Sequence, residues 1–390
     1  MPWKELNPMD QRVLFVADYM RELYSFSELC TRYGVSRKTG YKLIERYRRE
    51  GAEGLEERSR RPLRQPAQLP YAVQQAIIAL RGSRRMELGP KKIQVRLRER
   101  YPDLPVPSRT TIYNVLKRAG LITPRRLRRR VAPSAGVING IQTPNALWSA
   151  DFKGQFLTGD QHWCYPLTVM DHSSRYLLEC RALPGAQGAP TRASFERLFR
   201  RYGLPERMRT DNGVPFASTS TAGLSRLSIW WIRLGIVPER IEPGRPQQNG
   251  RHERMHRTLK RATLQPPASN ASVQQRRFDV FCQQYNAERP HEALAQRTPA
   301  SLYTPSPRPY PKRLPELTYP SYVHPHRVCS SGLIYWNAWR IYIGNLLAGE
   351  HVGIEPVGDG VWNVHFGPVW LGGFDERNAK KGEDYLTLKL

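Results

Sequence analysis

Apolar residues in the first 55 positions recur at helical spacing, and capping residues divide them into three short helices. Asn7 followed by a proline predicts the start of a helix that extends to about Tyr24. A capping box at 25–28 starts a second helix that a glycine ends. Ser36 caps a third, basic helix over 37–49. A short helix, a glycine turn and a serine-capped basic helix are typical of a helix-turn-helix unit.

The same pattern of short helices with a serine cap recurs further along the chain. Residues 56–70 are rich in proline and arginine and have no apolar period, which predicts a linker. Three more helices are then predicted at 71–81, 90–100 and 108–118, the last of them capped by Ser108. The pattern therefore predicts two helix-turn-helix units in tandem.

From about residue 145 the apolar period changes from helical to alternating. Trp148, Ala150 and Phe152 alternate with polar residues, which predicts a strand that continues to Phe156. Further strands are expected at 163–170, 176–183, 207–210 and 236–241, and helices around 195–202, 224–234, 251–263 and 273–285. Three antiparallel strands followed by alternating helices and strands indicate an α/β domain with a mixed sheet.

The last ninety residues read differently again. Six prolines within 304–320 predict a rigid connector. Short, closely spaced strands are expected at 333–336, 340–343, 352–357, 361–366 and 369–371. This spacing predicts a small all-β barrel or sandwich. The fold class expected for the whole chain is multidomain α+β, with tandem helix-turn-helix domains, an α/β core and a small β-barrel.

Composition and charge narrow the class of partner. The 390 residues include 61 Lys and Arg against 34 Asp and Glu, a net charge of +27. Such an excess favours a polyanionic partner, and nucleic acid is the obvious one. The chain contains no apolar stretch long enough to span a membrane and no apolar leader at its start, and its five cysteines form no C-x-x-C pair. We therefore expect a soluble protein of a reducing compartment that binds DNA or RNA.

A nucleic-acid partner turns the polar starts of the two serine-capped helices into candidate DNA contacts. In the first helix these residues are Arg37, Lys38, Thr39, Tyr41 and Lys42, and in the second they are Arg109, Thr110, Thr111 and Asn114. A run of arginines follows the second unit and is expected to contact phosphates: Arg125, Arg126, Arg128, Arg129 and Arg130. An ordinary solvated helix face is the alternative for each set, although it would have to recur at the same place twice.

Three carboxylates occupy related places in the predicted α/β domain. Asp151 lies on the first strand, Asp211 at the end of the fourth, and Glu253 near the start of the helix after the fifth. Strand ends and the helix starts that follow them converge on one crevice in such a sheet. Clustered carboxylates repel one another unless a hard divalent cation such as Mg²⁺ or Mn²⁺ neutralises them. Two such ions about 4 Å apart can activate and stabilise the oxygens of a reacting phosphodiester.

Other interpretations of these residues stay open on the sequence alone. Taken singly, the three acids read as a surface strand residue, a turn aspartate and a helix-start glutamate. His252 to His256 also satisfies the pattern H-E-x-x-H, in which two histidines on one helix face bind zinc, but no clear third ligand follows. A DNA-binding regulator that keeps the fold without the chemistry is a further alternative, against which the three intact acids argue.

Five motifs, taken together and in order, resemble a known family. They are WSADFKGQF, PLTVMDHSSRYLL, RTDNG, GRPQQNGRHERMHRTLK and YNAERPHEALAQRTPASLY, and they cover roughly residues 144–305. They resemble the integrase catalytic core of bacterial insertion-sequence transposases, the DDE type with a ribonuclease H-like fold. The tandem helix-turn-helix front and the β-rich tail are also arranged as in these transposases. The sequence departs from retroviral integrases in a longer spacing between Asp211 and Glu253 and in lacking their His-His-Cys-Cys zinc module.

The resemblance implies roles and partners. Asp151, Asp211 and Glu253 would bind two Mg²⁺ or Mn²⁺ ions, with no zinc and no nucleotide, while Arg257 and Lys260 would contact DNA. The implied function is transposition: binding terminal inverted repeats, hydrolysing the phosphodiester at the element ends and joining the 3′-OH to target DNA, as a dimer or tetramer in the bacterial cytoplasm at the nucleoid. The domains expected are helix-turn-helix units at 1–55 and 71–124, linkers at 56–70, 125–143 and 304–325, a catalytic core at 144–303 and a barrel at 326–380.

Overall fold

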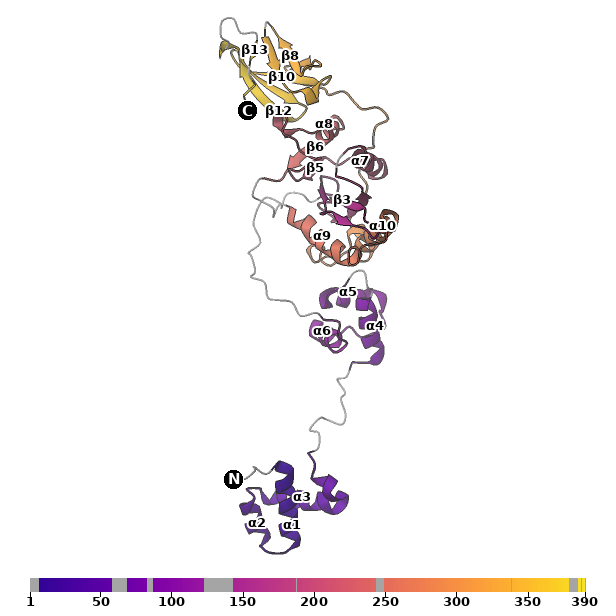
Figure 1. The fold of residues 1–390 in the computed structure, drawn as a ribbon, viewed down its shortest axis with the longest axis vertical. Coiled ribbons are helices and arrows are strands. Elements are labelled where there is room, and N and C mark those ends of the chain that lie inside the picture. Colours follow the sequence, from indigo (N-terminus) through magenta and orange to yellow (C-terminus); the bar gives the residue numbers. More distant parts are fainter. Residues whose placement is uncertain are drawn as a thin grey trace. The chain divides into compact units, whose positions relative to one another are not determined.

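The computed structural model describes residues 7–57, 69–82, 87–122, 143–186, 188–242, 249–337, 339–378, 385–386 and 388–389 (Figure 1). The chain divides into two compact units, Met1–Gln68 and Leu69–Leu390, and each is described by itself. The arginine run at 125–130 and most of the predicted linker at 56–70 lie outside the described residues. Among the described residues, no helix is both long and apolar enough to cross a membrane.

The first unit is a three-helix module with its own core. It contains α1 (Pro8–Met20), α2 (Phe26–Arg32), α3 (Arg37–Glu50) and the 3-10 turn η1 (Gly51–Leu55). The predicted caps are present, because Ser25 forms a capping box and the Ser36 hydroxyl accepts from the backbone N–H of Thr39. The first helix ends four residues before the predicted Tyr24, since Glu22 adopts a left-handed conformation with φ of 54°. The helix-turn-helix prediction is otherwise confirmed.

The second unit begins with another three-helix module. Its helices are α4 (Tyr71–Gly82), α5 (Pro90–Arg100) and α6 (Arg109–Arg118), within a residue of the predicted bounds. They pack around a core of their own that includes Ile77, Ile93 and Ile112, all fully buried. The Ser108 hydroxyl caps α6 as expected.

A mixed sheet follows. Its strands are β1 (Leu147–Phe152), β2 (Phe156–Leu157), β3 (Trp163–Asp171), β4 (Leu177–Leu183), β5 (Arg207–Thr210) and β6 (Val237–Arg240). They run in the order β2-β3-β1-β5-β6, with β4 also paired to β3. The β1–β3 and β3–β4 pairs are antiparallel, whereas β1–β5 and β5–β6 are parallel. The predicted mixed sheet is therefore confirmed, and the single strand expected over 148–156 is divided into β1 and β2.

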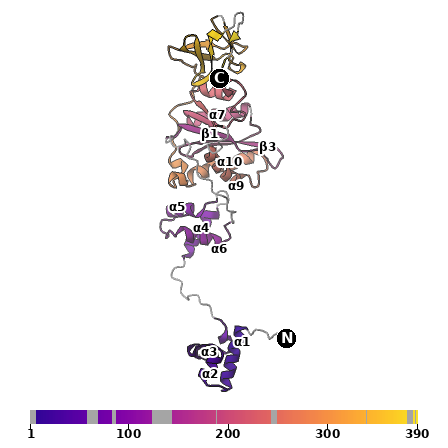
Figure 2. The ribbon, with the colours of Figure 1, turned by 90° about the vertical axis from the view of Figure 1, so that its left-hand side faces the viewer.

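Helices cover both faces of this sheet. Helices α7 (Ala189–Tyr202) and α8 (Arg226–Arg233) share a core with Trp148 and Val169, and α9 (Gly250–Thr263) and α10 (Ala271–Ala287) share a core with Met170 on the other face. In Figure 2, β1 and β3 lie between α7 on one side and α9 and α10 on the other. The polar positions of β1 thus face a layer of helices instead of water, and Ser149 is buried.

The C-terminal part is all-β, as predicted. One sheet has the order β12-β11-β10-β7 and the other β13-β9-β8. An isolated bridge pairs Gly373 of β12 with Lys389, after β13, but the described strands form no ladder that closes the two sheets into the predicted barrel. The strands are β7 (His324–Arg327), β8 (Leu333–Trp336), β9 (Trp339–Tyr342), β10 (His351–Gly358), β11 (Val361–Phe366), β12 (Val369–Asp375) and β13 (Tyr385–Leu386). Both sheets enclose one core, to which α8 contributes Ile229 and Ile232.

The remaining segments are short turns and an irregular connector. The 3-10 turns are η2 (Thr221–Gly223), η4 (Glu292–Leu294), η5 (Pro299–Ser301), η6 (Asn345–Leu347) and η7 (Glu376–Asn378). Residues 304–320 contain neither helix nor strand, which agrees with the predicted proline-rich connector. This connector is held against the α/β domain, because the N–H of Leu204 donates to the Arg308 carbonyl and the N–H of Ser306 donates to that of Tyr202.

Candidate active site

The site begins with the strand register. Asp151 lies opposite Thr168 in the antiparallel β1–β3 pair, and Ser149 lies two residues earlier on the same face. The apolar residues that alternate with them, Trp148 and Ala150, face α7 and α8 instead. The alternation that was visible in the sequence therefore delivers Asp151, Ser149 and Thr168 to the face that α9 covers.

Asp211 is placed on this face by the parallel pairing of β5 with β1. Arg209 pairs with Ser149, and Asp211 follows two residues later, directly after the end of β5. One oxygen of the Asp211 carboxylate accepts from the N–H of Gly213 at 3.2 Å. Asp211 therefore also stabilises the turn after β5, as expected for an aspartate two residues before a glycine in a turn.

The two carboxylates influence each other. Burial and the neighbouring Asp211 carboxylate raise the pKa of Asp151 to about 7. An amide hydrogen bond from Asn249 to the Asp151 Oδ2, at 3.0 Å, opposes that shift. A buried carboxylate beside a second one is unfavourable unless a cation or a proton lies between them. The paired oxygen donors therefore fit a hard divalent cation.

Glu253 lies in the first turn of α9, and its side chain is exposed. Asn249, the N-cap of this helix, approaches Asp151 through its hydrogen bond, and so does His256, whose Nδ1 is 3.8 Å from the Asp151 Oδ2. Glu253 is four residues after Asn249 and three before His256, so it lies on the same side of the helix. Within the described part of the chain, no hydrogen bond or ion pair joins Glu253 to Asp151 or Asp211. The structure thus brings Asp151 and Asp211 together. Glu253 lies on the side of α9 that faces them.

Two buried histidines meet one threonine beside Asp151. The Nε2 atoms of His252 and His256 each lie 2.7 Å from the Thr168 hydroxyl, and the Ser149 hydroxyl lies 2.9 Å from the Nδ1 of His252. Burial lowers the pKa of His252 to about 3 and that of His256 to about 2. Both rings are therefore neutral at physiological pH.

The geometry bears on the zinc alternative in two ways. Asp151, His252 and His256 offer ligand atoms within 4.8 Å of one another, so the fold supplies the third group that the H-E-x-x-H pattern lacked. Both nitrogens of His252 already contact protein hydroxyls, however. Zinc binding by both histidines would require these buried hydrogen bonds to break, whereas the carboxylates need no such change.

Thr168, Asn249 and the histidine contacts were not predicted. Thr168 occurs within the motif PLTVMDHSSRYLL, and only the pairing of β3 with β1 shows that it lies opposite Asp151. A signal was nevertheless present in the alternation of β3, because Thr168 is a polar residue between the apolar Leu167 and Val169.

The predicted DNA contacts of the first module lie on one accessible helix start. All five residues, Arg37, Lys38, Thr39, Tyr41 and Lys42, are exposed. Thr39 also serves the helix cap, since its N–H donates to the Ser36 hydroxyl and the two hydroxyls lie 2.9 Å apart. Tyr41 stacks on Phe26 with 4.0 Å between ring centroids, and 53% of it is exposed.

The second module repeats this arrangement. Arg109, Thr110 and Asn114 are exposed, and Thr111 is half-buried with its N–H and hydroxyl bound to Ser108. The two helix starts read SRKTGY and SRTTIY, so Tyr113 corresponds to Tyr41 and was missed as a candidate contact. Asn114, Lys117 and Arg118 line a shallow surface hollow on α6. Comparing the two helix starts would have identified Tyr113.

Two further predicted contacts lie on α9. Arg257 and Lys260 are both exposed. Lys260 is seven residues after Glu253 and four after His256, which places it on the face of α9 that approaches Asp151.

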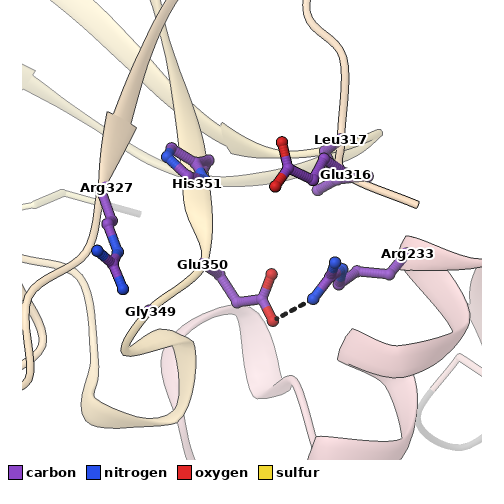
Figure 3. Close-up of a pocket in the computed structure, with 7 residues that line it drawn as sticks. All are labelled: Arg233, Glu316, Leu317, Arg327, Gly349, Glu350 and His351. Carbon is purple, nitrogen blue, oxygen red and sulfur yellow. Dashed lines mark hydrogen bonds and ion pairs between the residues drawn. The ribbon is translucent and has the colours of Figure 1, made fainter. Parts of the chain in front are cut away.

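A separate pocket lies away from the carboxylates. It has a volume of about 330 Å³ and is lined by Arg233, Glu316, Leu317, Arg327, Gly349, Glu350 and His351 (Figure 3). Arg233 of α8 forms an ion pair with Glu350 at 3.3 Å across it. This pocket therefore belongs to the seam between α8 and the C-terminal sheets, and none of the predicted site residues lines it.

Comparison with known proteins identifies the domains of the chain. Two models described as integrase core domains match residues 142–246 and 234–299, a helix-turn-helix domain model matches residues 11–62, and a homeodomain-like domain model matches residues 39–116. Among solved structures, the chain is similar to the HTLV-2 integrase catalytic core domain in complex with magnesium (15% identity, TM-score 0.33, 42% of this chain and 98% of that one). It is also similar to a chain of the simian T-cell lymphotropic virus intasome in complex with PP2A regulatory subunit B56 gamma (18% identity, TM-score 0.35, 71% and 93%).

Two relatives come from bacterial insertion elements. The uncharacterized 31.7 kDa protein of insertion element IS407 from Burkholderia multivorans is 28% identical over 196 residues, which are 49% of this chain and 67% of that protein. The uncharacterized 39.2 kDa protein of IS476 from Xanthomonas euvesicatoria is 28% identical over 205 residues, 52% of this chain and 57% of that protein. The chain therefore contains an integrase core domain and helix-turn-helix domains, and it is similar to proteins of bacterial insertion elements.

Proposed function

We propose that this protein binds the terminal inverted repeats of an insertion sequence, hydrolyses the phosphodiester at each element end and joins the exposed 3′-OH to target DNA. The observation that carries the proposal is the placement of Asp151 and Asp211 on one face of the sheet, beneath the helix that bears Glu253. Two divalent ions held by these three carboxylates would activate the attacking oxygen and stabilise the leaving oxygen. Joining by transesterification conserves the phosphodiester bond energy, so no nucleotide is required.

Other side chains would orient the carboxylates and bind the DNA. The Asn249 amide donates to the Oδ2 of Asp151 and so orients this carboxylate for a cation. Lys260 projects from the same helix face and is suited to bind a phosphate of the DNA end. The polar starts of α3 and α6 would read the inverted repeats, with the arginine run at 125–130 adding phosphate contacts.

We also propose the domain division given by the sequence, with helix-turn-helix domains at 1–55 and 71–124, a catalytic core at 144–303 and a β-domain at 326–380. The separate hydrophobic cores of the two helix-turn-helix modules support the first two divisions, and the α/β and β segments each have a core, although α8 contributes to both. Since one complex must hold both element ends, the active form would be a dimer or tetramer on double-stranded DNA at the bacterial nucleoid.

The test is a strand-transfer assay with full-length protein, labelled element-end DNA and target DNA. Asp151→Asn, Asp211→Asn and Glu253→Gln should each reduce cleavage and joining to background, because each amide removes a charge that offsets a divalent ion. Activity of the wild type should require Mg²⁺ or Mn²⁺, and all three variants should still bind the repeats. Glu288→Gln, an exposed acid after α10, is the matched control and should keep full activity.

Two results would contradict the proposal. Full activity in Asp151→Asn or Asp211→Asn would remove the carboxylate centre. Stoichiometric zinc in the purified protein, together with loss of activity in His252→Ala but not in Asp211→Asn, would favour the zinc alternative.

A further inference from the structure

The Thr168 hydroxyl has as many partners as a hydroxyl can accommodate. It donates to the carbonyl of Asp151 at 3.0 Å and lies 2.7 Å from the Nε2 of both His252 and His256. A hydroxyl can donate one hydrogen bond and accept two. Because we assign its single proton to the Asp151 carbonyl, which can only accept, both histidines donate from Nε2.

This proton count assigns the other nitrogen of each ring. A neutral imidazole that carries its proton on Nε2 has a lone pair on Nδ1. The Ser149 hydroxyl lies 2.9 Å from the Nδ1 of His252 and 3.4 Å from the Met170 carbonyl. The shorter contact is the one within ordinary hydrogen-bond distance for a hydroxyl, so Nδ1 accepts from Ser149 and every polar atom of that ring is satisfied. The Nδ1 of His256 has no such donor among the described residues and instead faces the Asp151 Oδ2 at 3.8 Å.

Two lone-pair atoms therefore face each other beside the second carboxylate, Asp211. His256 is 7% exposed and the Asp151 side chain 17% exposed, so little water is available to screen them. A divalent ion bound at about 2.1 Å holds its ligand atoms within about 4.2 Å of one another. The 3.8 Å between the Nδ1 and the Oδ2 falls inside that limit.

We propose that the Nδ1 of His256 is a further ligand to the divalent ion bound by Asp151, with Thr168 as the positioning residue that keeps this nitrogen unprotonated. The inference rests on the proposed function, because it adds a group to the same metal centre. Imidazole nitrogen binds Mn²⁺ and later transition ions in preference to Mg²⁺. The site should therefore favour Mn²⁺ more strongly than three carboxylates alone would.

The experiment is pulsed electron paramagnetic resonance of full-length protein loaded with Mn²⁺, which detects nitrogen bound directly to the ion. The wild type should show a coupling to one imidazole ¹⁴N, and labelling with ¹⁵N-histidine should convert it to a ¹⁵N coupling. His256→Asn should abolish the coupling and weaken Mn²⁺ binding about tenfold, with a smaller effect on Mg²⁺.

His252→Asn is the matched control, since it removes the other imidazole from the same hydroxyl and should retain the coupling. Thr168→Val keeps the shape of the strand residue but removes the hydroxyl, so it should weaken the coupling, and Thr168→Ser should restore it. Thr263→Val removes a buried α9 hydroxyl that bonds only within the helix, and it should leave Mn²⁺ binding unchanged.

A wild-type spectrum without nitrogen coupling would overturn the inference, as would loss of the coupling in His252→Asn. The ¹⁵N labelling needs no substitution, so it decides even if a variant fails to fold. Strand transfer measured on the same samples separates this inference from the proposed function. Activity without nitrogen coupling defeats only the histidine ligand, whereas coupling without activity defeats only the transposition chemistry.

Discussion

Asp151 combines a deep position with a charge that the surrounding protein does not neutralise. Its pKa of about 7 means that, without a metal, the carboxyl is half-protonated near neutral pH. A proton and a divalent ion would then compete for the same oxygens, so metal binding should weaken as the pH falls below 7. Because the site carries this cost without a bound cation, its residues are better explained by metal binding than by fold stability.

Lys260 allows a residue-scale prediction about the DNA end. Lys260→Ala should weaken binding of element-end DNA and lower strand transfer at limiting DNA, because it removes the proposed phosphate contact beside the carboxylates. Lys260→Glu should lower both further, since it places a negative charge against phosphate. Filter binding and strand-transfer assays measure the two effects.

The neighbouring Arg261 provides the control for Lys260. It is exposed as well, but one residue of helix turns it away from the face that bears Glu253. Arg261→Ala should therefore have a smaller effect on both assays. Wild-type strand transfer in Lys260→Ala at limiting DNA would show that the lysine is merely a solvated helix charge.

Single residues also show where prediction from sequence ends. Asp151, Asp211 and Glu253 could be selected because each stands at a strand end or helix start within a specific motif. The contact of His256 with Thr168 could not, because it depends on the angle at which α9 crosses β3. Local spacing contains no information about that angle, since it results from the packing of Met255 and Leu259 on the sheet.

At the scale of elements, the helices were predictable because capping residues in the local sequence mark their ends. Ser25, Ser36 and Ser108 each cap the helix that the sequence assigned to them. Strands β7 and β13 were missed, because the first reads HPHR and the second has only two residues, and neither alternates recognisably. Whether the C-terminal strands close into a barrel depends on pairings between distant segments, which the spacing of short strands does not specify.

The two serine-capped helices lead to a prediction about sequence-specific binding. Arg37→Ala and Arg109→Ala should each reduce the preference for element-end DNA over random duplex, by about 1–3 kcal/mol for a lost base contact. Gel-shift titrations of the full-length variants on both DNAs at moderate salt would measure this. The change should appear in specific binding and much less in nonspecific binding.

Exposed arginines outside these helix starts are the controls. Arg49, at the far end of α3, and Arg100, at the end of α5, should affect both DNAs about equally when changed to alanine, because they lie away from the helix starts proposed to read bases. Equal loss on both DNAs for Arg37→Ala and Arg109→Ala would place these two residues in the same phosphate-binding class.

Over the whole molecule, the histidines are distributed unevenly. All nine lie after residue 160, so the unit Met1–Gln68 contains none. Four of the nine have a strongly lowered pKa because of burial: about 2 for His172 and His256, and about 3 for His252 and His291. His172 is buried with both ring nitrogens unpartnered among the described residues, so protonation would leave a buried charge without an acceptor.

This distribution predicts that acid destabilises the second unit selectively. Below pH 6.5 the unfolded chain binds a proton at each of the four histidines while the folded chain does not, so the free energy of unfolding falls as the pH falls. The loss is about 1.4 kcal/mol per histidine at one pH unit below 6.5, or about 6 kcal/mol for all four as an upper limit. Proton uptake by Asp151, whose pKa in the folded protein is about 7, offsets about 2 kcal/mol of this loss. Hydrogen exchange of the metal-free, full-length protein at pH 7.5 and 5.5, converted to opening free energies, measures the net change. Peptides from β3, α9 and α10 should lose stability and those from α1 to α3 should not, while His172→Phe should remove about 1.4 kcal/mol of the loss. A similar loss in both units would show that the buried histidines are not its cause.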